Sequence, residues 1–150
     1  MLELKRDVFR ECSEKVGQRI ASLEAELRTL SESASSDTKS SMGDKYETAR
    51  EMMNLEKEKY STQLEDAEKM KTILNSLKIE HSSEKVVLGS LVKSSTCLFF
   101  VSISLGKIPV NGKEVFVISP LSPIGQSLMG KQVNNSIEFA GKVERIIAIA

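Results

Sequence analysis

The sequence has no tryptophan, one histidine and two cysteines. One histidine and two widely separated cysteines do not provide the known spacings of a zinc site, and we expect no disulfide between Cys12 and Cys97. No apolar run approaches the ~18 residues of a membrane-spanning helix, and the charged first residues are unlike a secretory signal. We therefore expect a cytoplasmic protein without membrane contact, whose cysteines are small buried hydrophobic residues.

An excess of either charge is also missing, since 21 Lys and Arg oppose 21 Asp and Glu. Proteins that bind nucleic acid by themselves usually have a clear cationic excess. We therefore expect no independent sequence-specific binding of nucleic acid. The charges are unevenly spread, with 14 basic and 17 acidic residues in 1–80 but only 7 and 4 in 81–150. This contrast predicts two regions of different architecture.

Residues 4–30 and 49–77 each carry one apolar stripe at helical spacing, with a serine-rich segment between them. Two helices that each have one face to bury fold back on one another, so residues 1–80 are predicted to form an antiparallel coiled-coil hairpin with its tip near 35–47. Each arm would be roughly 45 Å long. Glu56 falls on the second predicted stripe as a polar defect. The stripes are Leu4, Val8, Cys12, Val16, Ile20, Leu23, Leu27 and Leu30, and Ala49, Met53, Tyr60, Leu64, Ala67, Met70, Leu74 and Leu77.

The pattern after residue 82 is that of short strands rich in Val, Ile and Phe, such as "CLFFVSISL", "EVFVISP" and "KVERIIAIA". Asn111-Gly112 is a strong hairpin signal, and Asn134-Asn135 fits a second tight turn. A short helix is predicted from Pro123, with Gly130 as its stop. Residues 84–150 are thus predicted to form a small antiparallel sheet with one short helix, and the fold class is α+β.

Asp44 and Glu47 stand three residues apart where the second helix begins. One interpretation is a capping box, in which the two carboxylates accept hydrogen bonds from the amides of the first turn. The other is a metal site, because side chains at this spacing share a helix face and Mg²⁺ prefers oxygen ligands. Two carboxylates are too few to hold Mg²⁺ alone, so the ion would be shared with another macromolecule's site. The sequence leaves both interpretations open.

The segment "VISPLSPIGQSLMGKQVNNSIEF" resembles the most recognisable segment of the Gre-family transcript cleavage factors of bacterial RNA polymerase, where an "SPIxxxLxGKxxGD" pattern follows a strand of an FKBP-like domain. "GDKYETAREMM" is similar to that family's "GDLxENAEYHAAKE" segment, with Gly43, Asp44 and Glu47 in the matching places. Order, spacing and length agree over nearly the whole chain. The resemblance implies a coiled-coil hairpin followed by an FKBP-like domain.

In that family the coiled coil enters the polymerase secondary channel and the globular domain docks on its rim. The resemblance therefore implies that Asp44 and Glu47 help hold a Mg²⁺ ion shared with the polymerase active site, where the 3′ end of backtracked nascent RNA is cut. It also suggests Ser122, Pro123, Ile124 and Gly125 as partner-binding residues. The polymerase remains the enzyme, so we expect no catalysis by this chain alone and no cofactor bound to it alone.

Two alternatives remain open. The family's Asn-Ala-Glu-Tyr after the acidic pair is replaced here by Thr48, Ala49, Arg50 and Glu51, and Tyr46 lies inside the motif. A channel-binding paralogue that modulates or inhibits transcription without cleavage is therefore the first alternative. The second is a scaffold protein whose coiled coil pairs with another helix, which would require apolar positions on more than one face of the hairpin.

Overall fold

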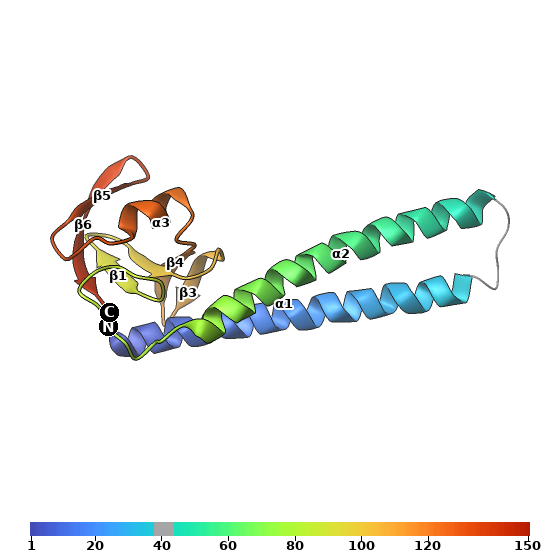
Figure 1. Cartoon of the computed structure of the whole chain (residues 1–150), viewed down its shortest axis with the longest axis horizontal. Coiled ribbons are helices and arrows are strands. Elements are labelled where there is room, and N and C mark those ends of the chain that lie inside the picture. The colour runs from blue at the N-terminus through green and yellow to red at the C-terminus, as the bar shows by residue number, and fades with distance from the viewer. Residues whose placement is uncertain (38–43) are drawn as a thin grey trace. The chain divides into compact units, whose positions relative to one another are not determined.

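The computed structural model describes residues 1–37 and 44–150, and their side chains except those of 34–37 and 44–46. It divides into two compact units (Figure 1). The hairpin unit is Lys15–Lys71, and the sheet unit combines Met1–Glu14 with Thr72–Ala150. The ends of the two long helices thus belong to the same compact unit as the strands.

The hairpin unit is built from parts of α1 (Leu2–Asp37) and α2 (Asp44–Ser76), which run in opposite directions (Figure 1). The predicted helical hairpin is confirmed, because the apolar residues of each stripe are largely withdrawn from solvent. In this unit Val16, Leu23 and Ala67 are fully buried, and Ile20, Leu27, Leu30, Met53, Tyr60, Leu64 and Met70 are half-buried.

Among the described residues, no helix is long and apolar enough to cross a membrane.

Two positions of the second stripe differ from the prediction. Ala49 is exposed, so its place on the buried stripe was wrong. Glu56 is also exposed, and the half-buried residue is Lys57. The reason is geometric, because steps of four and then three residues from Met53 lead through Lys57 to Tyr60 on one side of a helix with 3.6 residues per turn.

The sheet unit contains a six-stranded sheet in the order β3-β4-β2-β1-β6-β5. With the two long helices and one short helix, it confirms the α+β class. The sheet is mixed rather than wholly antiparallel, since β2 and β4 are parallel. β3 is the edge strand and pairs antiparallel with β4. β4 also pairs with β2, and these two strands run in the same direction. The elements are β1 Leu91–Ser94, β2 Leu98–Val101, β3 Gly106–Val110, β4 Lys113–Ile118, α3 Pro123–Leu128, β5 Ser136–Phe139 and β6 Lys142–Ile149.

Both predicted tight turns are present. Asn111 and Gly112 have φ of 51° and 75° and join β3 to β4, with Val110 paired to Lys113. This matches the two-residue hairpin turn that requires positive φ at both central positions. Asn134 has φ of 74°, and the amide of Asn135 donates to the carbonyl of Gln132 at 3.0 Å.

One face of the sheet carries an apolar cluster that α3 joins through Leu128. Three phenylalanines meet there, with ring centroids 5.7 Å apart for Phe99 and Phe116, and 5.0 Å apart for Phe99 and Phe139. Such pairs add about 0.5–1.5 kcal/mol each beyond the area they bury. The buried members of the cluster are Val86, Val92, Phe99, Val101, Leu128, Ile137 and Ile146.

A buried carboxylate holds the β1–β2 turn. Glu144 of β6 accepts hydrogen bonds from the Ser94 hydroxyl at 2.8 Å, the Thr96 hydroxyl at 2.5 Å and the Thr96 amide at 3.0 Å. The hydrogen bond from the Thr96 hydroxyl, followed by that from Ser94, keeps the pKa of Glu144 below its ordinary value. The turn is therefore tied to a strand about fifty residues away in sequence.

The start of α1 is tied to the segment after α2. The Lys5 ammonium, which is buried, donates to the carbonyl of His81 at 2.9 Å, and burial lowers the pKa of Lys5. Arg6 forms two hydrogen bonds to the Glu80 carboxylate, at 2.7 and 2.6 Å. A replacement without a donor group at residue 5 would leave the His81 carbonyl without this hydrogen bond. These contacts fix the connection from α2 to the sheet against the first turns of α1.

Candidate functional site

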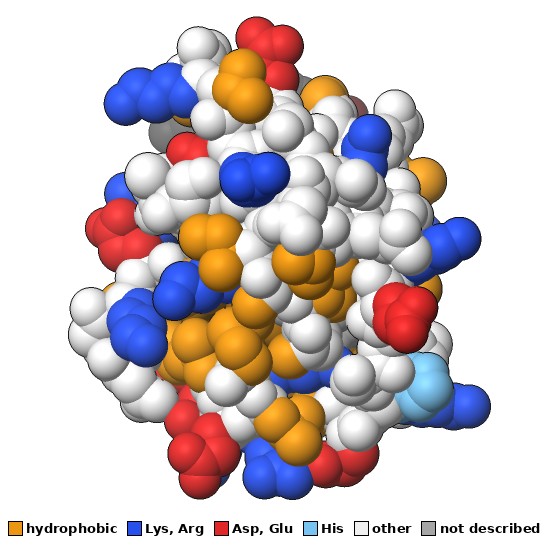
Figure 2. Space-filling model, turned by 90° about the vertical axis from the view of Figure 1, so that its left-hand side faces the viewer, with side chains coloured by type: hydrophobic (Ala, Val, Ile, Leu, Met, Phe, Trp, Pro, Cys, Tyr) orange, Lys and Arg blue, Asp and Glu red, His pale blue; other side chains and the backbone are white. Residues whose placement is uncertain are grey.

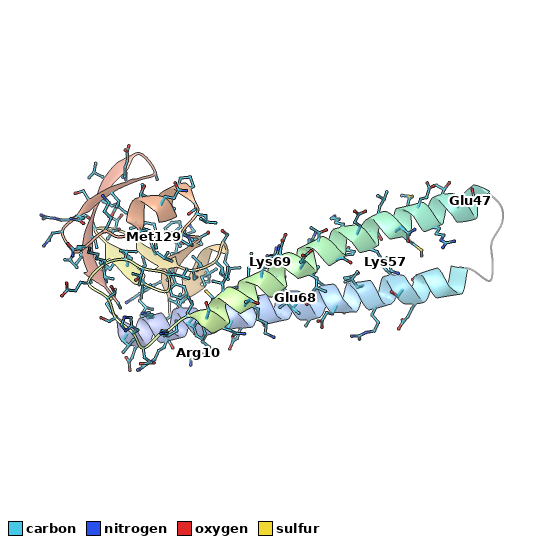
Figure 3. The ribbon with its side chains drawn as sticks, in the orientation of Figure 1. Arg10, Glu47, Lys57, Glu68, Lys69 and Met129 are labelled. Carbon is cyan, nitrogen blue, oxygen red and sulfur yellow. The ribbon has the colours of Figure 1, made fainter. Side chains whose placement is uncertain are left out.

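The predicted acidic pair lies at the beginning of α2. The helix begins at Asp44, so Glu47 is in its first turn, on the same face as Asp44. Glu47 is exposed and lies near that end of α2 (Figure 3). The side chain of Asp44 and residues 38–43 at the predicted tip lie outside the described residues. The capping box and the shared metal site therefore both stay predictions.

The surroundings of Glu47 set what its carboxylate can do. The positive end of the helix dipole stabilises an anionic side chain in the first turn. The neighbouring described residues Thr48, Arg50 and Glu51 are also exposed. Within the part of the chain that the structure describes, no three His, Cys, Asp or Glu side chains group closely enough to hold a metal ion. The described side chains alone therefore give Glu47 no three-ligand site of this kind.

The second predicted site, at the start of α3, has a clear local structure. Ser122 is the N-cap, and its hydroxyl accepts from the Gly125 amide at 3.1 Å and donates to the Ser119 carbonyl at 2.6 Å. Pro123 occupies the first turn, where its missing N–H costs nothing. Ile124 packs against the apolar cluster. These contacts give the segment a folding role, while its predicted role in partner binding stays a prediction.

Gly125 is required by a close approach between backbones. A Cβ atom there would lie 2.0 Å from the Ser119 carbonyl oxygen and 2.9 Å from the Pro120 Cα. Side chains cannot relieve this contact, because both atoms belong to the backbone. α3 can therefore lie against the end of β4 only with glycine at this position.

Exposed apolar side chains near α3 were not singled out from the sequence. Leu121 is 81% exposed, and it lies beside the exposed Pro123, one of the partner-binding residues predicted above. Figure 2 shows a face of the molecule on which hydrophobic side chains are surrounded by Lys, Arg, Asp and Glu side chains. The sheet unit also exposes Val143 and Ile147 of β6. Residues 81–150 carry 7 basic and 4 acidic side chains.

The sequence analysis also missed exposed apolar residues on the hairpin. Met52 and Leu55 of α2 are 64% and 65% exposed. The sequence did contain a sign of this exposure, because Met52 and Leu55 both lie outside the apolar stripe. Met52 comes directly before Met53 of the stripe, and Leu55 comes two residues after it. Neither spacing places a side chain on the buried face of a helix that buries Met53.

No family model matches the chain, and a search of curated proteins finds no match. Among solved structures, the chain is similar to one titled "Structure of the transcription factor Gfh1". The two sequences are 20% identical, the match covers 91% of this chain and 92% of that chain, and the TM-score is 0.35. A likeness at this identity and TM-score does not by itself assign a function.

Proposed function

We propose that the chain is a transcription elongation factor that binds the secondary channel of bacterial RNA polymerase and stimulates cleavage of backtracked RNA. The observation that carries the proposal is the exposed Glu47, three residues after Asp44, in the first turn of a long hairpin helix. The sequence resemblance assigns these two positions to the acidic pair of the Gre family. The sheet and α3, which follow the hairpin in chain order, suit the domain that docks on the channel rim.

In this proposal the chain supplies ligands and the polymerase performs the reaction. Glu47 and Asp44 present carboxylate oxygens from one helix face to a site that the polymerase completes. The shared Mg²⁺ ion, when bound, activates water and stabilises the charge that develops at the phosphodiester. Exposure of Glu47 supports this role, because a carboxylate buried within the chain could not reach another molecule's site.

Two alternative functions have specific observations in their favour. Arg50 is exposed at the place where the family has a glutamate, and this change of charge favours a paralogue that binds the channel without stimulating cleavage. The exposed Met52 and Leu55 favour a scaffold whose hairpin pairs with another helix, because they form a second apolar surface on α2.

The decisive test separates the capping role of the acidic pair from its metal role. Asn is as good an N-cap as Asp, and Gln replaces Glu in capping boxes, so Asp44→Asn and Glu47→Gln keep the helix start while removing the charge. Transcript cleavage is measured on stalled elongation complexes from the same organism. We expect each variant to lose at least about tenfold in cleavage rate, equivalent to about 1.4 kcal/mol, while polymerase affinity changes less than about twofold.

Other outcomes of these experiments would refute the metal role or favour one of the two alternative functions. Cleavage at the parental rate by both amide variants would refute the metal role and leave capping as the function of the pair. Binding without cleavage by the parent chain would favour the modulating paralogue. A parent chain that neither binds polymerase nor competes with a Gre factor would leave the scaffold.

A further inference from the structure

The outer face of α2 near its beginning carries an exposed apolar pair. Met52 and Leu55 are three residues apart and therefore neighbours on the helix surface. They are 64% and 65% exposed. Met53 is half-buried and belongs to the apolar stripe that the two helices bury. The outer pair is therefore not needed for packing of the described hairpin.

Carboxylates flank this pair on one side. Glu51 precedes Leu55 by one helical turn and Glu58 follows it by one turn, so all three share a face. Together with Asn54 they line a shallow hollow of about 310 Å³. Lys59 follows Leu55 by four residues and lies on the flank nearer Met52. We define the Leu55 patch as Glu51, Met52, Leu55 and Glu58.

The charge of the Leu55 patch indicates which class of molecule can bind there: nucleic acid, lipid or protein. Phosphates of a nucleic acid would be repelled by Glu51 and Glu58, since nucleic-acid binding depends on Lys and Arg. Anionic lipid surfaces likewise attract basic segments rather than acidic ones. Arg50 and Lys57 lie on other faces of the helix, whereas Lys59 flanks Leu55 on the side away from Glu51 and Glu58. A protein surface with apolar and basic side chains complements this arrangement.

We infer that the Leu55 patch is a docking surface for a basic protein wall that places apolar side chains on Met52 and Leu55, and Lys or Arg side chains beside Glu51 and Glu58. This inference rests on the proposed function and adds a contact to it. Leu55 is eleven residues after Asp44, so the contact lies about 16 Å along the helix from the acidic pair. The wall belongs to the channel through which α2 would pass, and the contact would set how deeply the hairpin enters.

The test measures binding of the full chain to core RNA polymerase from the same organism. Met52→Ser with Leu55→Ser removes the apolar contact at positions that are exposed, so the fold is expected to remain intact. We expect the affinity to fall at least about tenfold, which corresponds to about 1.4 kcal/mol. Ala21→Ser is the control, because Ala21 is an exposed apolar residue of α1 in the same compact unit and outside the patch. Its affinity should stay within about twofold of the parent.

A second variant tests the charge. Glu51→Lys with Glu58→Lys should weaken binding most at low salt, because salt screens the repulsion that the new lysines would meet at a basic wall. Unchanged affinity in both double variants, with the parent still binding, would overturn the inference and leave the proposed function standing. A parent that does not bind polymerase would refute both.

Sedimentation of the same proteins tests whether the Leu55 patch instead binds a second copy of this chain. A parent that sediments as a dimer, with the Met52→Ser and Leu55→Ser variant a monomer, would overturn the inference, because the patch would then be a self-association surface. A parent and variant that are both monomers, together with the loss of polymerase affinity, would support it.

Discussion

Substitution of Gly125 by alanine tests the packing of α3 against the end of β4. The added Cβ would lie 2.0 Å from the Ser119 carbonyl oxygen, and the two next atoms, both also backbone, would be 2.9 Å away. Overpacking of this kind costs about 1–3 kcal/mol, and we expect the upper end because no side chain can move aside. Alanine in place of glycine in a helix gains about 1 kcal/mol. The net expected loss of unfolding free energy is therefore about 2 kcal/mol.

Amide hydrogen exchange followed by NMR gives a regional measurement of this loss. Protected amides of β2 and β4 exchange through opening of the sheet unit, and about 2 kcal/mol should speed their exchange by a factor of about 30. Amides of α1 within Lys15–Lys71 should change little, because they belong to the other compact unit. This regional difference separates a local clash from a general loss of folding.

Gly17→Ala is the matched control. Gly17 lies within α1, and a Cβ atom there would meet no atom within 4 Å. The same substitution should therefore stabilise α1 by about 0.5–1 kcal/mol through the lower conformational entropy of the unfolded chain. A Gly125→Ala variant whose sheet amides exchange at the parental rate would refute the steric reasoning. A change in stability equal to that of Gly17→Ala would refute the assignment of the effect to the close backbone contact.

Two further predictions concern single polar groups of the sheet unit. Because hydrogen bonds from Thr96 and Ser94 lower the pKa of Glu144, its contribution to stability is present above the unfolded value of about 4.5 and is lost as the pH falls through the lower folded value. Urea unfolding from pH 7 to pH 3 should therefore show a steeper acid loss for the parent than for Glu144→Gln, and equal slopes would contradict this. Ser122→Ala removes the N-cap of α3 and should cost about 1 kcal/mol in urea unfolding, whereas Ser122→Asp should keep most of the stability. No difference between these two substitutions would exclude capping as the role of Ser122.

Regular patterns along the sequence predicted most of the elements. The apolar stripes of both long helices required only local spacing, and Asn111-Gly112 defined the β3–β4 turn by its backbone preference. The parallel pairing of β2 with β4 could not be predicted in this way. Alternation of apolar and polar residues within a strand indicates which side chains are buried. It does not indicate which strand pairs with it, or whether that strand runs parallel or antiparallel.

The polar contacts show the same limit of local patterns. Glu144 is a single acidic residue in a strand and suggests a solvent-facing position, yet it is buried beneath the turn containing Ser94 and Thr96. Its partners are 48 to 50 residues away in sequence. Only the β1–β6 pairing brings them together. The Leu55 patch was missed for a different reason, since a search for one buried stripe assigns no meaning to apolar residues outside it.

The described contacts separate two kinds of evidence for function. Ser122, Ile124 and Gly125 each have a contact within the sheet unit that accounts for the residue type. A sequence resemblance in this segment therefore supports a similar local fold more strongly than a shared partner. Glu47, Met52 and Leu55 are exposed, and the packing of the described hairpin requires none of them. Because hairpin packing does not account for these side chains, substitutions of Met52 and Leu55, and the amide variant of Glu47 that keeps a capping box, report on partner binding with little cost in stability. The hairpin is accordingly where the proposed function can be tested most directly.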